Sequence, residues 1–276
     1  MGRKSVTVTV HGGISVVSAF PCGKGASVAL EIPLATSIEP GGRPGEFEYI
    51  VKSISDRLGG DVNFSISVVS GIPERQGLKS SSALVGSILL AYAAYNNIEL
   101  DDSEFLKIGS EVSLETSLSA TGATDDLAAS ILGGLCMTDN IHKNLEKRIP
   151  VENIPVIIIP GMPGERSSSF GKADFSWLKS VYERMYSILR IDNMELIAVA
   201  NGYYMGQISG NYLPGALLGG LNHDVCGVNG RGPSVFLVHR NVDNLSKDMN
   251  QLRRRNLDPI LTHMTNSRAE VVEHDA

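Results

Sequence analysis

The first stretch of this 276-residue sequence with residues suited to chemistry is a serine-, glycine- and lysine-bearing loop at 72–83. It follows a strand-like run at 62–69 and precedes an apolar run at 83–95, so the pattern predicts strand, loop and helix. A helix N-terminus offers unpaired N–H groups and a positive dipole end, which suits a phosphate. One serine would serve as an ordinary N-cap, but three serines with a glycine and a lysine favour phosphate binding. The candidate residues are Pro73, Gly77, Leu78, Lys79, Ser80, Ser81, Ser82 and Ala83.

A second feature is the pair of adjacent carboxylates Asp125 and Asp126, which opens a short apolar segment that ends at Gly133 and Gly134. Acids in the first turn of a helix are common caps, and this explains one of the two. The other is a candidate general base, because a partly buried carboxylate can accept a proton from a hydroxyl group.

Two further carboxylates, Glu111 and Glu115, stand four residues apart on a helix predicted from about residue 101 to 117. This spacing puts both on one face, where like charges repel unless a cation lies nearby. The simpler interpretation is a solvated face on which Lys107 relieves Glu111.

Basic residues occur in three glycine-bearing segments. Lys24 lies between Gly23 and Gly25, where a backbone can approach a ligand closely. On its own, this turn is more simply a tight hairpin with an exposed lysine. The other two segments are the loop at 161–171, which carries Arg166, and the stretch at 222–232, which carries Gly230 and Arg231.

The composition is that of an ordinary globular protein, with 42% hydrophobic and 20% charged residues and a net charge of −6. This charge disfavours nucleic acid and anionic membrane as partners, but it places no limit on small anionic substrates. No apolar run is long enough for a membrane span, and the N-terminus predicts a strand and no signal peptide. Three scattered cysteines fit a reducing cytoplasm and show no metal-binding spacing.

The remaining patterns place the elements that hold these residues. Alternating valines and threonines at 6–10 predict a first strand, and the apolar residues 156–159 predict a buried one. A domain boundary is predicted at 150–155, which begins and ends with proline. Helices are predicted at about 47–58, 175–190, 193–209 and 242–256, and further strands at 235–238 and 259–264.

Three signals now agree in order and spacing: the loop at 73–81, the aspartate segment at 122–134, and a Gly-x-x-Gly-x-Gly-Pro-Ser stretch at 227–234. Together they resemble the GHMP kinase superfamily, which includes galactokinase, homoserine kinase, mevalonate kinase and phosphomevalonate kinase. Within it, residues 11–26 and 121–126 look most similar to the archaeal type of shikimate kinase. The resemblance runs from residue 6 to about residue 240.

The resemblance implies an α+β, two-domain GHMP kinase fold. Residues 1–153 would form an N-terminal ATP-binding domain similar to the second domain of ribosomal protein S5. Residues 154–276 would form a ferredoxin-like C-terminal domain, with the active site in the cleft between the two. It also implies ATP and Mg²⁺ as the cofactors.

The resemblance assigns roles position by position. Ser81 matches the family's magnesium serine, and Glu115, eleven residues before Asp126, matches its magnesium glutamate. A metal there would offset the repulsion between the two glutamates. Asp126, seven residues before Gly133, matches the catalytic aspartate, and Asp125 is a close neighbour that could be coupled to it.

The loop departs from the family pattern Gly-Leu-Gly-Ser-Ser-Ala at two positions. Lys79 stands where glycine is usual, and Ser82 stands where alanine is usual. Lysine adopts a positive φ less easily than glycine, which bears on the conformation of this loop.

The implied reaction is phosphorylation of a shikimate hydroxyl by ATP, giving shikimate 3-phosphate in a cytoplasmic enzyme. A basic residue must meet the substrate carboxylate, and the sequence leaves Lys24, Arg166 and Arg231, with its neighbour Gly230, as candidates. Homoserine kinases carry asparagine at the position of Asp126, which argues against homoserine. The alternatives are another GHMP kinase, of the homoserine or mevalonate type, or a ligand sensor without turnover. The expected partners are thus ATP and a small carboxylate-bearing alcohol, and the sequence gives no oligomeric state.

Overall fold

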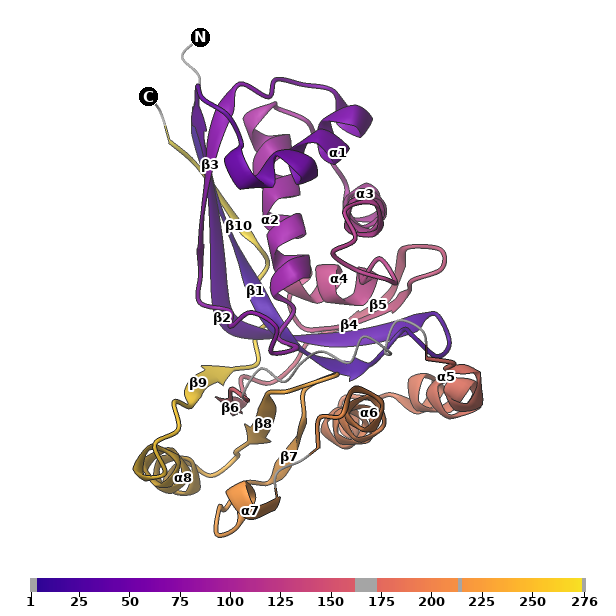
Figure 1. Ribbon diagram of the computed structural model, residues 1–276, viewed down its shortest axis with the longest axis vertical. Helices are drawn as coiled ribbons and strands as arrows, with labels where there is room; N and C mark the ends of the chain where they lie inside the picture. The colour runs from indigo at the N-terminus through magenta and orange to yellow at the C-terminus, as the bar shows by residue number, and fades with distance from the viewer. Residues whose placement is uncertain (1–3, 162–172, 213–214, 275–276) are drawn as a thin grey trace.

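The computed structural model describes residues 4–161, 173–212 and 215–274. Two β-sheets lie end to end in this part of the chain, each covered by helices (Figure 1). The predicted mixed α+β class is confirmed. None of the helices described is long and apolar enough to cross a membrane.

The first sheet is built on two long antiparallel strands, β1 (Ser5–Val17) and β2 (Lys24–Pro40). Burial alternates along the first half of β1, as its valine–threonine pattern predicts, and then becomes continuous from residue 12 onward. The change occurs because helices of the first part of the chain and helix α6 (Met194–Ser209) of the second part both pack on β1. The end of this strand therefore lies at the junction between the two sheets (Figure 1).

Shorter strands complete the first sheet. The opening of β2 pairs with β4 (Leu135–Asp139), which continues to β5 (Asn144–Ile149), whereas the far half of β2 pairs with β3 (Phe64–Ser70). With β10 (Glu270–His274) from the end of the chain, the sheet order is β10-β1-β2-β4-β5, and β3 also pairs with β2.

Four helices cover one face of this sheet. Helix α2 (Ser80–Tyr95) is apolar on all sides and buried along most of its length, as expected for a core helix. Around it pack α1 (Glu48–Leu58), which follows the 3₁₀ turn at Gly45–Phe47, then α3 (Asp102–Glu115) and α4 (Thr124–Leu132). Helix α3 begins with a capping box, in which Asp101 and Glu104 bond each other's backbone N–H groups.

The second sheet has the order β7-β8-β6-β9, with every pair antiparallel. This is the ferredoxin-like order that the resemblance implies. Its strands are β6 (Pro155–Ile159), β7 (Val225–Val228), β8 (Val235–Val238) and β9 (Ile260–His263). The predicted strand at 156–159 is buried on both faces: Ile157 and Ile159 face a small core with the last helix, and Val156 and Ile158 join the main core.

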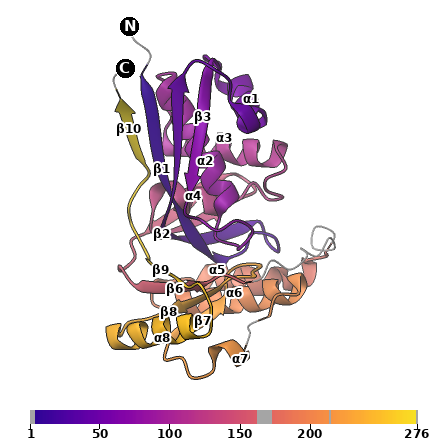
Figure 2. The ribbon, with the colours of Figure 1, turned by 60° about the vertical axis from the view of Figure 1, so that its left-hand side comes forward.

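Four helices belong to the described residues of the second part of the chain (Figure 2). They are α5 (Lys179–Ile188), preceded by a 3₁₀ turn at Ser176–Leu178, α6 (Met194–Ser209), the short α7 (Gly215–Leu218) and α8 (Val242–Arg254). Helix α6 packs on β1 and β7, and so joins the two parts of the molecule.

The end of the chain returns to the first sheet. Strand β10 (Glu270–His274) pairs antiparallel with β1, which brings both termini to the same end of the molecule (Figure 1). The sequence predicted no strand here, and the resemblance placed all of 154–276 in the second domain. The boundary near 153 and 154 stays a prediction, but residues 270–274 belong to the first sheet.

Candidate active site

A pocket of about 680 Å³ opens at the junction between the two sheets. Its walls come from the loop before α2, the segment between α3 and α4, the end of β1, the end of α6 and the β7–β8 loop. A volume of this size suits a small ligand. Of the residues that the sequence singled out, the pocket is lined by Gly77, Lys79, Ser80, Ser81, Ser82, Asp125, Asp126, Gly230 and Arg231.

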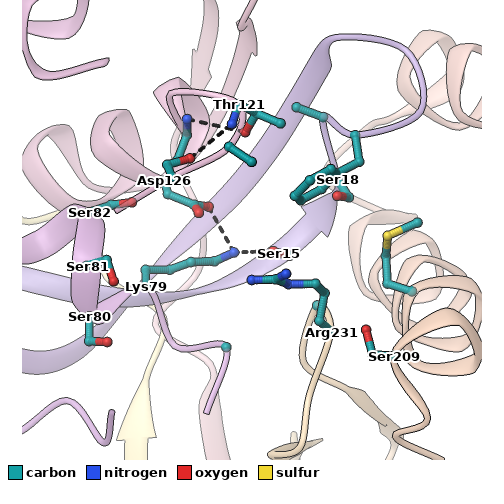
Figure 3. A pocket seen from close by; sticks show the side chains of 18 of the residues that line it. Ser15, Ser18, Lys79, Ser80, Ser81, Ser82, Thr121, Asp126, Ser209 and Arg231 are labelled. Carbon is teal, nitrogen blue, oxygen red and sulfur yellow. Dashed lines mark hydrogen bonds and ion pairs between the residues drawn. The ribbon is translucent and has the colours of Figure 1, made fainter. Parts of the chain in front are cut away.

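The loop before α2 approaches the second sheet closely. Gly77 has a φ of +79°, and a Cβ atom there would lie 2.5 Å from the carbonyl oxygen of Asn229. Helix α2 starts at Ser80 without a side-chain cap, so its first backbone N–H groups are available to an anion. The three serines line the pocket at this helix end (Figure 3), whereas Leu78 and Ala83 are buried in the core.

Lys79 takes the left-handed conformation that its position in the loop requires, with a φ of +73°. The backbone turn directs the side chain into the pocket, where Nζ lies 2.9 Å from Oδ1 of Asp126 and donates a hydrogen bond to Oγ of Ser15 (Figure 3). Only 8% of this side chain is exposed. The lysine that replaces the usual glycine therefore contacts the candidate base directly.

The two aspartates have different environments. Both lie in the first turn of α4, which follows Ala123 in a left-handed conformation with a φ of +49°. The side chain of Asp126 is 18% exposed and faces the pocket. Asp125 is buried, and this burial, together with repulsion from Asp126, raises the pKa of Asp125 to about 7. Lys79 opposes that rise but does not cancel it.

Ser27 contacts both aspartates, and Asn140 contacts Asp125. The hydroxyl oxygen of Ser27 lies 2.9 Å from Oδ2 of Asp125 and 2.6 Å from Oδ1 of Asp126. The amide of Asn140 donates to Oδ1 of Asp125 at 2.9 Å. Gly25 permits this packing, since a Cβ atom there would lie 2.5 Å from the carboxyl carbon of Asp125.

Arg231 enters the pocket from the β7–β8 loop. Its guanidinium carbon lies 5.6 Å from the ring centre of Phe20, and the group reaches toward Lys79 and Ser15 (Figure 3). The amide of Asn211 donates to the backbone carbonyl of Arg231 at 2.6 Å, which fixes the loop. A cation held on an aromatic face in a pocket is suited to an anionic group of a ligand.

The second part of the chain is bonded to two walls of the pocket, the loop before α2 and the end of β1. The side-chain amide of Gln76, in the loop before α2, bonds the N–H and C=O of Gly161 at 2.9 and 3.0 Å. Asn229 accepts from the backbone N–H of Ser15 at 3.2 Å, and Asn201 accepts from that of Ser18 at 3.0 Å. These contacts set the positions of the phosphate loop and of the end of β1 relative to Arg231.

The predicted site residue Lys24 lies outside the pocket. Lys24 pairs with Glu146 and, at 3.9 Å, with Asp139, and its ammonium lies 5.3 Å from the ring centre of Tyr186. Lys24 does not line the pocket, because its strand turns the side chain toward β4 and β5. The third candidate for the substrate carboxylate, Arg166, lies outside the described residues.

Glu115 is also outside the pocket. Its carboxylate accepts from Ser53 at 2.6 Å and from Arg57 at 2.7 Å, and these two contacts lower the pKa of Glu115. Arg57 and Lys143 also pair with Glu111, so cations from α1 and the β4–β5 turn offset the repulsion between the glutamates. The magnesium role of Glu115 stays a prediction, and this placement does not support it: the spacing to Asp126 holds in sequence, but α3 turns this residue toward Ser53 and Arg57 of α1. The simpler interpretation with Lys107 named the wrong cation.

Several residues of the site were not predicted. Ser15 and Ser27 come from segments that read as ordinary strands, and Asn140 follows a strand that the sequence did not show. Arg75 lies in the predicted phosphate loop but was not singled out. Ser27 did give a signal, since it is a polar residue within the apolar run at 26–32. In the structure it is fully buried.

Comparison with known proteins agrees with this architecture. The model of the family described as "GHMP kinases N terminal domain" matches residues 47–134. A shikimate kinase of Thermoplasma acidophilum is 31% identical over 84% of this chain and 86% of its own length. A shikimate kinase of Pyrococcus furiosus is 28% identical, over 82% and 88%.

Solved structures share the fold at lower identity. The mevalonate kinase of Methanococcus jannaschii superposes with a TM-score of 0.72 at 15% identity, over 94% of this chain and 98% of that one. A putative homoserine kinase of Listeria monocytogenes gives 0.70 at 17% identity, over 97% and 99%. The fold is thus that of the GHMP kinases, a class of small-molecule phosphotransferases. Given the sequence identity over most of both chains, this chain belongs to that superfamily, in the family of the archaeal shikimate kinases.

Proposed function

We propose that this enzyme transfers the γ-phosphoryl group of ATP to a ring hydroxyl of shikimate, giving shikimate 3-phosphate. The relatives' names support the acceptor, and one observation carries the chemistry. A lysine–aspartate pair, Lys79 and Asp126, lies in the same pocket as the uncapped start of α2. Such a pocket combines a place for phosphates with a charged group for the acceptor hydroxyl.

The nucleotide phosphates would bind at the start of α2. The loop from Pro73 to Ala83 supplies backbone N–H groups, the hydroxyls of Ser80, Ser81 and Ser82, and the positive end of the helix dipole. Arg75 also lines the pocket from this loop and adds a positive charge. Buried Leu78 and Ala83 would act only by fixing the loop to the core.

The pocket also offers oxygen donors for Mg²⁺. The described residues contain no group of three or more histidine, cysteine or acidic side chains suited to a metal. Mg²⁺ needs no such cage, because in kinases it is bound by one or two protein oxygens, the substrate phosphates and water. Ser81 lines the pocket and fits this donor set. When bound, the ion would neutralise charge on the phosphates.

Asp126 would orient the acceptor hydroxyl and take its proton. Its two contacts from Ser27 and Lys79 both end on Oδ1, so Oδ2 is the oxygen that remains for the acceptor among the residues the structure describes. The ammonium of Lys79 pairs with this carboxylate at 2.9 Å and helps to hold it in place. The positive charge of Lys79 would also stabilise the negative charge of the γ-phosphoryl group while it is transferred to the acceptor.

The acceptor carboxylate would bind Arg231, beside Gly230. The sequence left three basic candidates, and Arg231 is the one of them that the described structure places in the pocket. Shikimate is a rigid ring, so it loses little conformational freedom when its carboxylate and a hydroxyl are held at two ends of one pocket.

An acceptor panel tests this proposal. Purified protein is incubated with ATP, Mg²⁺ and, in separate tubes, shikimate, homoserine or mevalonate, and ADP release is followed. We expect acceptor-dependent ADP with shikimate, and a phosphate ester on the ring by ³¹P NMR. ADP release with another alcohol and none with shikimate would overturn the substrate but keep the kinase. No release with any acceptor would favour the ligand sensor.

A further inference from the structure

The hydroxyl group of Ser27 contacts a carboxylate oxygen of both Asp125 and Asp126, and its single hydrogen atom cannot serve both contacts if both aspartates are ionised. Its hydroxyl oxygen is 2.9 Å from Oδ2 of Asp125 and 2.6 Å from Oδ1 of Asp126, both within hydrogen-bond distance. A serine hydroxyl carries one hydrogen and can donate to only one of them. The other contact needs a proton from a carboxylic acid, because two oxygens without a hydrogen between them repel each other.

The surroundings show which aspartate carries that proton. Oδ1 of Asp126 lies 2.9 Å from the ammonium of Lys79, so Asp126 is the ionised partner and accepts from Ser27. Asp125 is buried beneath it, in contact with the neutral amide of Asn140 and the hydroxyl of Ser27. Burial disfavours a charge at this position.

Asn140 also places the proton on one oxygen. The hydroxyl of Thr138 donates to Oδ1 of Asn140 at 2.6 Å, so the NH₂ group of that amide points to Asp125. Oδ1 of Asp125 is therefore an acceptor. The proton lies on Oδ2, the oxygen that faces Ser27.

The charges around Asp125 agree with this arrangement. Asp126 on the same helix repels a negative charge on Asp125, and Lys79 before α2 attracts it. On the other packed elements, Cys136 of β4 and Tyr186 of α5 have raised pKa values, each mainly through its own burial and in part through Asp125. Lys79 is thus the nearest cation among these groups, and it is already bonded to Asp126.

We infer that Asp125 works as a neutral carboxylic acid, a positioning residue that donates through Ser27 to the catalytic carboxylate of Asp126. The chain of donors runs from Oδ2 of Asp125 to Oγ of Ser27, and from Oγ to Oδ1 of Asp126. It fixes the carboxylate plane of Asp126 and leaves Oδ2 for the acceptor. The inference rests on phosphoryl transfer in this pocket, but not on shikimate being the acceptor.

Two isosteric variants separate the roles. Asp125→Asn keeps a donor toward Ser27 and an acceptor toward Asn140, so we expect kcat within about tenfold of the wild type. Asp126→Asn removes the base, and we expect a loss of about 10²-fold or more. Deprotonation of Asp125 breaks the donor chain, so the wild type should lose kcat/KM on the basic side, near the pKa of about 7, and Asp125→Asn should not.

A second measurement does not depend on turnover. The infrared spectrum of the wild type at pH 6 should contain the carbonyl stretch of a protonated carboxylic acid, and Asp125→Asn should lack it. Ser27→Ala breaks the chain without changing either aspartate. We expect kcat to fall about tenfold with KM for ATP unchanged, because the carboxylate of Asp126 loses the donor that fixes its plane.

Ser37→Ala is the matched control for Ser27→Ala, since Ser37 lies on the same strand and bonds Thr7 away from the pocket. The inference is overturned if Asp125→Asn loses as much kcat as Asp126→Asn, if the infrared band persists in Asp125→Asn, or if Ser27→Ala behaves like Ser37→Ala. If Asp125→Asn fails to fold, the comparison of Ser27→Ala with Ser37→Ala still tests the inference. These assays use whichever acceptor the panel identifies, so an acceptor other than shikimate would overturn the proposed substrate but leave this inference intact.

Discussion

The ammonium of Lys79 lies 2.9 Å from the carboxylate of Asp126, although the two residues come from the starts of different helices, α2 and α4. Both helices follow a residue in the left-handed region, Lys79 itself in one case and Ala123 in the other. A left-handed residue other than glycine costs on the order of 1 kcal/mol. The fold accepts this strain twice at the same pocket, which supports a functional reason for the pair.

Lys79→Gly tests that reason. Glycine suits a φ of +73° and should remove the backbone strain, so we expect the melting temperature to stay the same or rise slightly. The variant also deletes the ammonium, and we expect kcat to fall about 10²-fold. Circular dichroism melting and a coupled ADP assay measure the two effects. The control for removing a lysine charge is Lys107→Met, on α3. Methionine is used there because glycine would disrupt the helix.

A Lys79→Gly enzyme with near wild-type kcat would show that the lysine serves only the loop. Loss of both stability and activity would point to a structural role for the ion pair. Only a stable, inactive variant agrees with the proposed mechanism.

Magnesium dependence separates Ser81 from Glu115. Ser81 lines the pocket at the start of α2, whereas Glu115 is bonded to Arg57 and Ser53 outside it. We therefore expect Ser81→Ala to raise the Mg²⁺ concentration for half-maximal rate, and Glu115→Gln to leave it unchanged. Both are read from rate against Mg²⁺ at saturating ATP. A clear increase for Glu115→Gln would restore the role that its spacing to Asp126 suggested.

The pKa of Asp125 also predicts how stability depends on pH. The pKa rises from 3.8 in the unfolded chain to about 7 in the folded protein, because the site is buried. Between these values the unfolded chain loses the proton first, so stability falls as pH rises from about 4 to about 7. Asp125→Asn lacks this term, and its stability relative to wild type should increase over that range, on the order of a few kcal/mol.

Urea unfolding at several pH values measures this difference. Asp102→Asn, which removes an exposed carboxylate paired with Arg268, corrects for the change in charge. A difference between wild type and Asp125→Asn that stays constant from pH 4 to pH 8 would contradict a raised pKa for Asp125.

Sequence patterns predicted most of the fold where burial follows a regular period. The alternation at 6–10 and the apolar runs at 83–95 and 156–159 correspond to β1, α2 and β6. Strand β10 was missed because all its side chains are exposed, so it lacks an apolar pattern and is held by backbone pairing with β1. Strand β5 was not predicted for a similar reason, because most of its residues are polar.

The site was predictable where one loop carries several functional groups. The serines after Lys79 and the two aspartates needed only local spacing. Partners that arrive across the fold gave no such signal: Ser15, Ser27 and Asn140 become neighbours of the aspartates and Lys79 only when β1, β2 and β4 are assembled. Glu115 shows the converse, because its spacing fits but its helix face does not.

Arg231 and Lys24 give the last test, because the sequence could not choose between them and the structure separates them. Arg231 lines the pocket against Phe20, whereas Lys24 is paired with Glu146 outside it. A charge-assisted hydrogen bond to a carboxylate contributes about 1.5–3 kcal/mol. We therefore expect Arg231→Met to raise KM for the acceptor about 10- to 100-fold with KM for ATP nearly unchanged, and Lys24→Met to change neither beyond about twofold. Steady-state kinetics with each substrate varied in turn measures both, and an increase in acceptor KM for Lys24→Met alone would move the carboxylate site away from Arg231.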